Sequence, residues 1–147
     1  MKMVDYDGKL NNNKDYLNML KKLQEKCEYI EVVIIWEGET NDLVEKFQKD
    51  IIERKKVSEW WATKTNAVNN FFKIKASDEL FKYLEQFETF CKFYFYGDNK
   101  TSLIKGDYCE NTDFGIDDIA FYDKDGNMLL GTTTHEGYIS VCEDLVL

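Results

Sequence analysis

Three short β-type runs separated by two turn signals occupy residues 119–142, IAFYDKDGNMLLGTTTHEGYISVC. The runs are 119–122, 128–135 and 138–142. They are rich in aliphatic, aromatic and threonine side chains, which fit a pleated strand. An Asp-Gly and a Glu-Gly pair stand between the runs, and glycine accepts the positive φ that tight hairpin turns need. The stretch therefore predicts a three-stranded antiparallel meander.

Upstream of the meander, apolar residues recur at spacings of three and four, which is the signature of amphipathic helices. A short polar side chain that can cap the first turn precedes or begins each of these segments. The first expected helix runs from Asn13 to Glu28, with Asn12 or Asn13 as its cap. The second runs from Asp42 to Lys56 and is capped by Asp42. The third runs from Ser77 to Phe87 and is capped by Ser77.

Further strands are expected between and after these helices. Val32-Val33-Ile34-Ile35 leaves no polar face for water, so the strand around it should be buried and central. The expected strands are Ile30–Trp36, Val57–Thr63, Asn70–Ala76 (joined to the previous one around Thr65-Asn66), Phe90–Tyr96 and a short one near Ser102–Lys105 in a surface loop. The sequence thus predicts an α+β protein, one domain over residues 1–147, with three helices packed on a mainly antiparallel sheet that ends in the meander.

Most of the net charge of −9 lies at one end of the sequence. Residues 105–147 hold ten Asp and Glu against two Lys, whereas the preceding 104 residues are close to neutral. Such a field attracts basic proteins and repels nucleic acid and anionic lipid. Aromatic residues among these acids can anchor a protein partner. The predicted partner-binding residues are Asp107, Tyr108, Glu110, Asp113, Phe114, Asp117, Asp118 and Tyr122.

Motifs for catalysis, metals or cofactors are weak in this chain. The run 123–127 resembles a calcium loop, but Met128 and Thr134 stand where an EF-hand needs Gly and Glu, so a hairpin turn is the better interpretation. His135 is the single histidine, which excludes sites that need two imidazoles. No Gly-rich phosphate loop and no Gly-x-Ser-x-Gly motif occurs. We therefore expect no catalytic residues, metal or cofactor.

Cysteine spacing and hydropathy bear on location. The four cysteines form no CxxC pair and are expected to be free thiols, with Cys27 and Cys91 as small core residues. No apolar run approaches the roughly 20 residues of a membrane span, and residues 1–14 are polar. These features favour a cytoplasmic protein without a membrane partner. Of the adjacent Trp60 and Trp61, one should be exposed if both lie on a strand.

The segment from Asp117 to Ile139, with its Asp-Gly turn and the Gly131-Thr132-Thr133-Thr134 run, resembles the tail of small bacterial immunity proteins. The resemblance implies a non-enzymatic protein that neutralises a basic, possibly nuclease, toxin domain by tight binding. Two alternatives stay open: a small hydrolase or transferase that uses His135 with a nearby carboxylate, and an uncommitted domain from a sporulation or phage locus.

Overall fold

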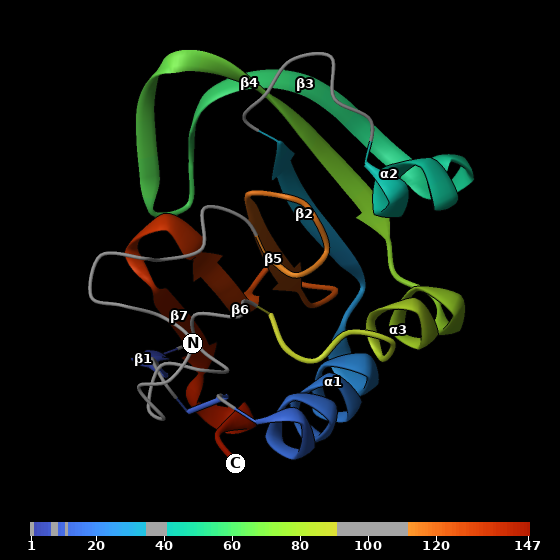
Figure 1. Cartoon of the computed structure of the whole chain (residues 1–147), viewed down its shortest axis with the longest axis vertical. Helices are drawn as coiled ribbons and strands as arrows, with labels where there is room; N and C mark the ends of the chain where they lie inside the picture. Colours follow the sequence, from blue (N-terminus) through green and yellow to red (C-terminus); the bar gives the residue numbers. More distant parts are fainter. Residues whose placement is uncertain (1, 7–8, 11, 35–40, 91–111) are drawn as a thin grey trace.

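A computed structural model describes residues 2–6, 9–10, 12–34, 41–90 and 112–147. Its strands form one antiparallel sheet in the order β1-β7-β6-β5-β2-β4-β3 (Figure 1). The strands are β1 (Met3–Asp5), β2 (Tyr29–Ile34), β3 (Ile51–Trp60), β4 (Thr63–Lys75), β5 (Asp118–Tyr122), β6 (Met128–Thr133) and β7 (Tyr138–Cys142). The helices are α1 (Asn13–Lys26), α2 (Asp42–Lys46) and α3 (Asp78–Leu84), with short 3-10 turns at 48–50, 134–136 and 143–145. The predicted α+β class is confirmed.

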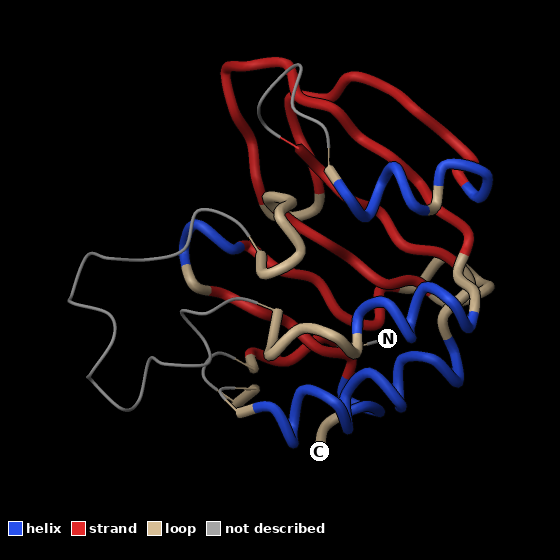
Figure 2. The backbone as a smooth tube through the Cα atoms, turned by 45° about the vertical axis from the view of Figure 1, so that its right-hand side comes forward, coloured by secondary structure: helices blue, strands red, loops and turns tan. Residues whose placement is uncertain are grey.

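All three helices lie on the same side of the curved sheet (Figure 2). Tyr16, Leu20 and Leu23 form the buried stripe of α1, and Leu80 and Phe81 do the same for α3. These side chains pack against apolar residues of the central strands in one core. None of the helices in the described part of the chain is long and apolar enough to cross a membrane.

The first turns of α1 and α3 are capped by polar side chains that precede them. Asn12 Oδ1 accepts a hydrogen bond from Asp15 N at 2.9 Å, and Ser77 Oγ accepts one from Leu80 N at 3.1 Å. These bonds satisfy N–H groups that the first turn of a helix leaves without partners. The expected starts of α1 and α3 are therefore confirmed.

The expected second helix is wrong in its cap and its length. Asn41, not Asp42, caps α2, and the helix ends at Lys46. The segment from Ile51 onward is strand β3, which pairs with β4. Ile51 follows Phe47 by four residues, which is helical spacing, but isoleucine is also β-branched and favours a strand. The pairing with β4 decides between the two, and it leaves Ile52 58% exposed.

The β3–β4 hairpin is longer than expected and turns at Trp61-Ala62 rather than around Thr65-Asn66. Its part beyond the ladder with β2 curves away from the central strands, and its tip lies near β6 (Figure 1). Trp60 and Trp61 at this tip pack with Val33 and Phe71 in a second apolar cluster, separate from the main core. The expectation of an exposed tryptophan required both residues to lie on a strand, but β3 ends at Trp60 and Trp61 lies in the turn; Trp60 is buried and Trp61 half-buried.

The meander of β5, β6 and β7 is confirmed. Residues 123–127 form the β5–β6 turn, with Gly126 at φ +81° and the Asp123 carboxylate accepting from the backbone N–H groups of Asp125 and Asn127. Gly137, at φ +74°, ends the turn before β7. The strands expected at 90–96 and 102–105 fall, apart from Phe90, outside the described residues.

Candidate functional site

A pocket of about 290 Å³ opens between the start of α2, helix α3 and the turn at 112–117. It is lined by Asn41, Asp42, Tyr83, Phe87, Asp113, Phe114 and Gly115. Two of the predicted partner-binding residues, Asp113 and Phe114, are among them. Among the described residues, the lining includes two carboxylates and no Lys or Arg. We call this site the acidic pocket.

Asn41 fixes α2 to the 112–117 turn. Its Oδ1 accepts from Val44 N at 3.1 Å as the helix cap, and its Nδ2 donates to Phe114 O at 3.0 Å. Gly115 follows at φ +80°, where a Cβ would lie 3.1 Å from the Asn41 amide nitrogen. Within the turn, Thr112 Oγ1 donates to the backbone oxygen of Ile116 at 2.9 Å. These bonds hold the rim of the pocket in place before any ligand arrives.

Aromatic rings form the apolar wall of the acidic pocket. The ring centroids of Tyr83 and Phe87 are 5.4 Å apart, and those of Phe87 and Phe114 are 5.0 Å apart. Phe47 packs edge-on against Tyr83 at 5.7 Å. Edge-to-face packing of this kind restricts ring motion and adds to the energy of burial. The wall therefore offers a preformed surface to an apolar or cationic side chain.

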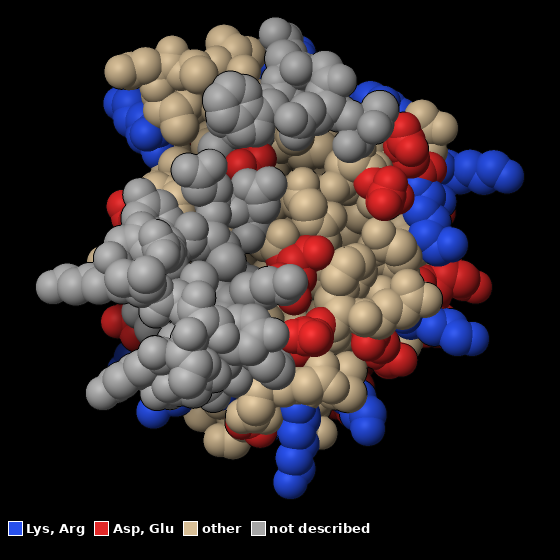
Figure 3. Space-filling model, in the orientation of Figure 1, with Lys and Arg blue, Asp and Glu red and all other residues tan. Residues whose placement is uncertain are grey.

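The charges around the pocket are negative. Burial raises the pKa of Tyr83, and the Asp42 carboxylate raises it further. Burial also raises the pKa of Tyr16, with further contributions from Asp113 and Glu85. Nearby carboxylates disfavour ionisation of a phenol because the product is another anion. In Figure 3, Asp and Glu gather around an uncharged central area of the described surface, and most Lys and Arg project near its edge.

The other predicted residues do not join this pocket. Asp107, Tyr108 and Glu110 lie outside the described residues. Asp117 is buried, and its backbone N donates to Val33 O at 2.9 Å. Tyr122 stacks on Tyr29 at the far end of β5, with ring centroids 5.1 Å apart.

The Asp118 carboxylate is buried and joins three parts of the fold through hydrogen bonds. It is 1% exposed, and its Oδ2 accepts from Trp60 Nε1 at 2.8 Å. Its Oδ1 accepts from Thr134 N at 2.8 Å and from Thr132 Oγ1 at 3.1 Å. The indole of Trp61 donates to Thr132 O at 2.8 Å. We call the two indole bonds the tryptophan latch, because they tie the β3–β4 tip to β5 and β6. A carboxylate buried in this way cannot meet a partner on the surface, which corrects the inclusion of Asp118 in the predicted set.

Sequence reasoning missed the helical half of the acidic pocket. Tyr83 lies on α3, whereas Phe87 lies three residues beyond the end of that helix at Leu84. Asp42 lies in the first turn of α2. No spacing in the sequence indicates that this pair meets Asp113, because the meeting depends on how α3 and the segment after it pack.

His135 lies exposed after β6, in the 3-10 turn at 134–136. Its Nε2 is 3.8 Å from Glu136 Oε1, and this is its one polar contact among the described residues. His135 does not line the acidic pocket. The Glu136 carboxylate is therefore near the imidazole of His135, but in the described part of the chain no nucleophilic side chain contacts that imidazole.

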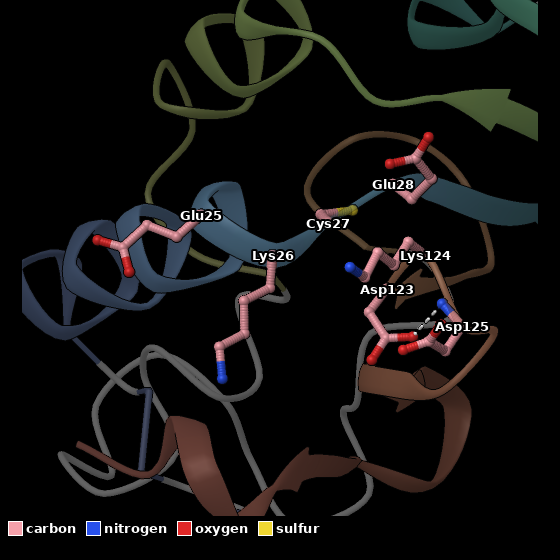
Figure 4. A pocket seen from close by; sticks show the side chains of 7 residues that line it. All are labelled: Glu25, Lys26, Cys27, Glu28, Asp123, Lys124 and Asp125. Carbon is pink, nitrogen blue, oxygen red and sulfur yellow. Dashed lines mark hydrogen bonds between the residues drawn. The ribbon is translucent and has the colours of Figure 1, made fainter.

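A second pocket, of about 390 Å³, lies between the end of α1 and the β5–β6 turn (Figure 4). Its side chains carry both signs of charge, and Glu25 points away from the turn. The Asp123 carboxylate is occupied by the turn itself, through Asp125 N at 2.9 Å. Burial raises the pKa of the Cys27 thiol to about 12, so this cysteine is not a thiolate nucleophile at neutral pH. The described residues contain no group of three or more His, Cys, Asp or Glu side chains that could hold a metal ion.

Comparison of the chain with known protein families, curated proteins and solved structures gave no match. The resemblance of the C-terminal segment to immunity proteins is therefore not accompanied by any wider similarity.

Proposed function

We propose that the protein is a non-enzymatic binding protein that receives a basic segment of a partner protein in the acidic pocket. The observation that carries the proposal is the pairing of two carboxylates, Asp42 and Asp113, with the aromatic wall of Tyr83, Phe87 and Phe114. A Lys or Arg side chain has two parts that complement this site, its charged end and its methylene stem. Its charge faces the carboxylates, and its methylene stem packs on the rings.

The excess of acidic residues supports the same partner. Opposite charge speeds the encounter of two proteins and disfavours partners of the wrong sign, while buried aromatic side chains carry most of the affinity. A cognate basic toxin domain, neutralised by stoichiometric binding, fits this chemistry and the resemblance of the segment 117–139. The proposal places the protein in the cytoplasm, where free thiols such as Cys27 and Cys142 stay reduced.

Binding of a fluorescein-labelled peptide rich in Lys and Arg, followed by fluorescence anisotropy, tests the site. We expect salt-sensitive binding that is weakened by the double substitution Asp42→Asn/Asp113→Asn, mainly through slower association. The matched control is Glu136→Gln/Glu143→Gln, which removes the same charge from exposed positions outside the pocket. Equal binding by both variants would show that net charge, and not the pocket, attracts the peptide.

The immunity class needs a separate test with a toxin. A basic toxin domain encoded beside this protein can be co-expressed with it, and cell growth scored. A blocker neutralises the toxin at a fixed molar ratio, whereas an enzyme acting on the toxin or its product works below that ratio. Growth rescue at substoichiometric amounts would refute the binding mechanism.

A further inference from the structure

The β3–β4 hairpin has the opposite charge from the rest of the molecule. Residues 51–75 carry six Lys and Arg against two Glu, within a chain whose net charge is −9. The hairpin is therefore a positive region on a negative protein, at the far end of the sheet order from β1. An acidic partner would be steered toward this region and away from the remainder of the surface.

Strand β3 is the last strand of the sheet and pairs only with β4 among the described strands. The register shifts between Ile51 and Glu53 and again between Val57 and Glu59. Between these irregularities, residues 53–57 keep a regular ladder, and residues 53–56 are exposed. An edge strand of this kind presents backbone donors and acceptors on its outer side.

A groove of about 350 Å³ follows the regular part of β3. It is lined by Arg54, Lys55, Lys56, Asn70, Phe71 and Phe72. The Arg54 guanidinium lies 5.8 Å from the centroid of the Phe72 ring, and Lys55 Nζ lies 4.7 Å from that of Phe71. Lys55 is also 3.0 Å from Glu53 Oε1.

Arg54 is the best placed of these cations for an anion. The ring of Phe72 is the one group that its side chain contacts among the described residues, so no carboxylate of that part of the chain occupies the guanidinium. The ring supports the guanidinium plane, while the N–H donors at its edge can bind a carboxylate through two bonds. The planar fork of a guanidinium matches the geometry of a carboxylate, which suits Arg54 to recognise an acidic side chain.

We propose that the outer edge of β3 binds an extended acidic peptide segment by strand addition. This inference goes beyond the proposed function and does not depend on it. Successive residues of a strand point to opposite faces, so Arg54 and Lys55 flank an added strand on both sides. Two consecutive Asp or Glu residues in that strand would each meet one cation. The backbone ladder favours a peptide over nucleic acid, which has no matching row of amide groups.

The test uses a fluorescein-labelled peptide of alternating Thr and Val interrupted by two adjacent Glu residues. We expect it to bind the full chain and to shift the backbone NMR signals of residues 53–57. The double substitution Arg54→Glu/Lys55→Glu should weaken binding by about tenfold or more, since charge-assisted hydrogen bonds are lost and repulsion replaces them. The control is Lys64→Glu/Lys75→Glu, which changes the same charge at exposed positions of β4 and should weaken binding by no more than about twofold. Circular dichroism establishes that both variants are folded.

Two further ligands separate strand addition from simple attraction of charge. A peptide N-methylated along one edge keeps its carboxylates but cannot complete the ladder, so we expect it not to bind. Equal binding of the methylated peptide would overturn strand addition. Tighter binding of a single-stranded oligonucleotide than of the acidic peptide would overturn the choice of partner. Failure of the unmodified peptide to bind would mean that the cations only protect the edge from aggregation, which also overturns the proposal.

Discussion

Replacing Trp60 by phenylalanine tests whether the tryptophan latch holds the β3–β4 hairpin on the sheet. The substitution keeps an aromatic ring but removes the indole N–H that lies 2.8 Å from Asp118 Oδ2. A hydrogen bond to a charged group contributes about 1.5–3 kcal/mol, and the volume lost from a buried ring adds about 1 kcal/mol. We therefore expect Trp60→Phe to lower the free energy of unfolding by about 2.5–4 kcal/mol.

Urea unfolding followed by far-ultraviolet circular dichroism measures this loss, because the midpoint falls while the slope stays constant if only the folded state is affected. The control is Trp61→Phe, which removes an N–H bonded to the neutral carbonyl of Thr132 at 2.8 Å. That bond is worth about 0.5–1.5 kcal/mol. If Trp60→Phe costs no more than Trp61→Phe, the buried carboxylate does not strengthen the latch.

A double-mutant cycle with Asp118→Asn identifies the partner of the indole. Groups that interact directly show a coupling free energy of about 0.5–3 kcal/mol, whereas independent substitutions add within about 0.5 kcal/mol. We expect clear coupling between Trp60→Phe and Asp118→Asn. Additive effects would refute the role of the carboxylate, even if each substitution alone is destabilising.

Four further substitutions test the glycine positions, the β5–β6 turn and the histidine. Gly115→Ala should lower the free energy of unfolding by about 1–2 kcal/mol, because φ is +80° at this position. Gly131→Ala should lower it by less, because the added Cβ meets the flexible end of the Met128 side chain. Chemical denaturation of the two variants compares these losses directly. Backbone N–H donors hold the pKa of Asp123 below its ordinary value, so its contribution to stability is present above the ordinary Asp pKa and is lost as the pH falls through the lowered value. Unfolding measured against pH should lose this acid-side component in Asp123→Asn, and an unchanged pH profile would contradict the assignment. His135→Ala should leave the binding of the basic peptide unchanged, because the imidazole is exposed and does not line the acidic pocket; turnover in a hydrolase screen that disappears with this substitution would favour the enzyme alternative.

Local patterns in the sequence predicted those parts of the fold that local chemistry determines. Asn12 and Ser77 cap their helices through bonds to residues three positions ahead, and the turn at 123–127 is closed by its own side chains. The second helix was predicted too long because Ile51 continues the helical spacing of Leu43 and Phe47, although a β-branched residue also favours a strand. Pairing with β4 resolved that ambiguity, and pairing is a non-local property that spacing cannot show.

The candidate site was predicted only in part, because some of its residues meet through non-local packing. Acidic and aromatic composition identified Asp113 and Phe114, which line the acidic pocket. The same reasoning grouped Asp118 with the surface acids, because it ends the acidic stretch 107–118 and charge composition does not distinguish a buried carboxylate from a solvated one. Its burial depends on the N–H of Trp60, 58 residues away, which supplies a bond that water would otherwise make. Tyr83 enters the pocket only through the packing of α3.

The position of β2 in the sheet has a consequence for how the protein folds. β2, β3 and β4 form one group that is close in sequence, and β5, β6 and β7 form another. The β2–β5 ladder joins the two groups, although Val33 and Asp118, which it pairs, are far apart along the chain. Each group can form early, but the junction must wait for a long loop to close, which slows folding. Amides in the β2–β5 ladder are therefore expected to exchange hydrogen only on global unfolding, while the tip of the β3–β4 hairpin exchanges through local opening.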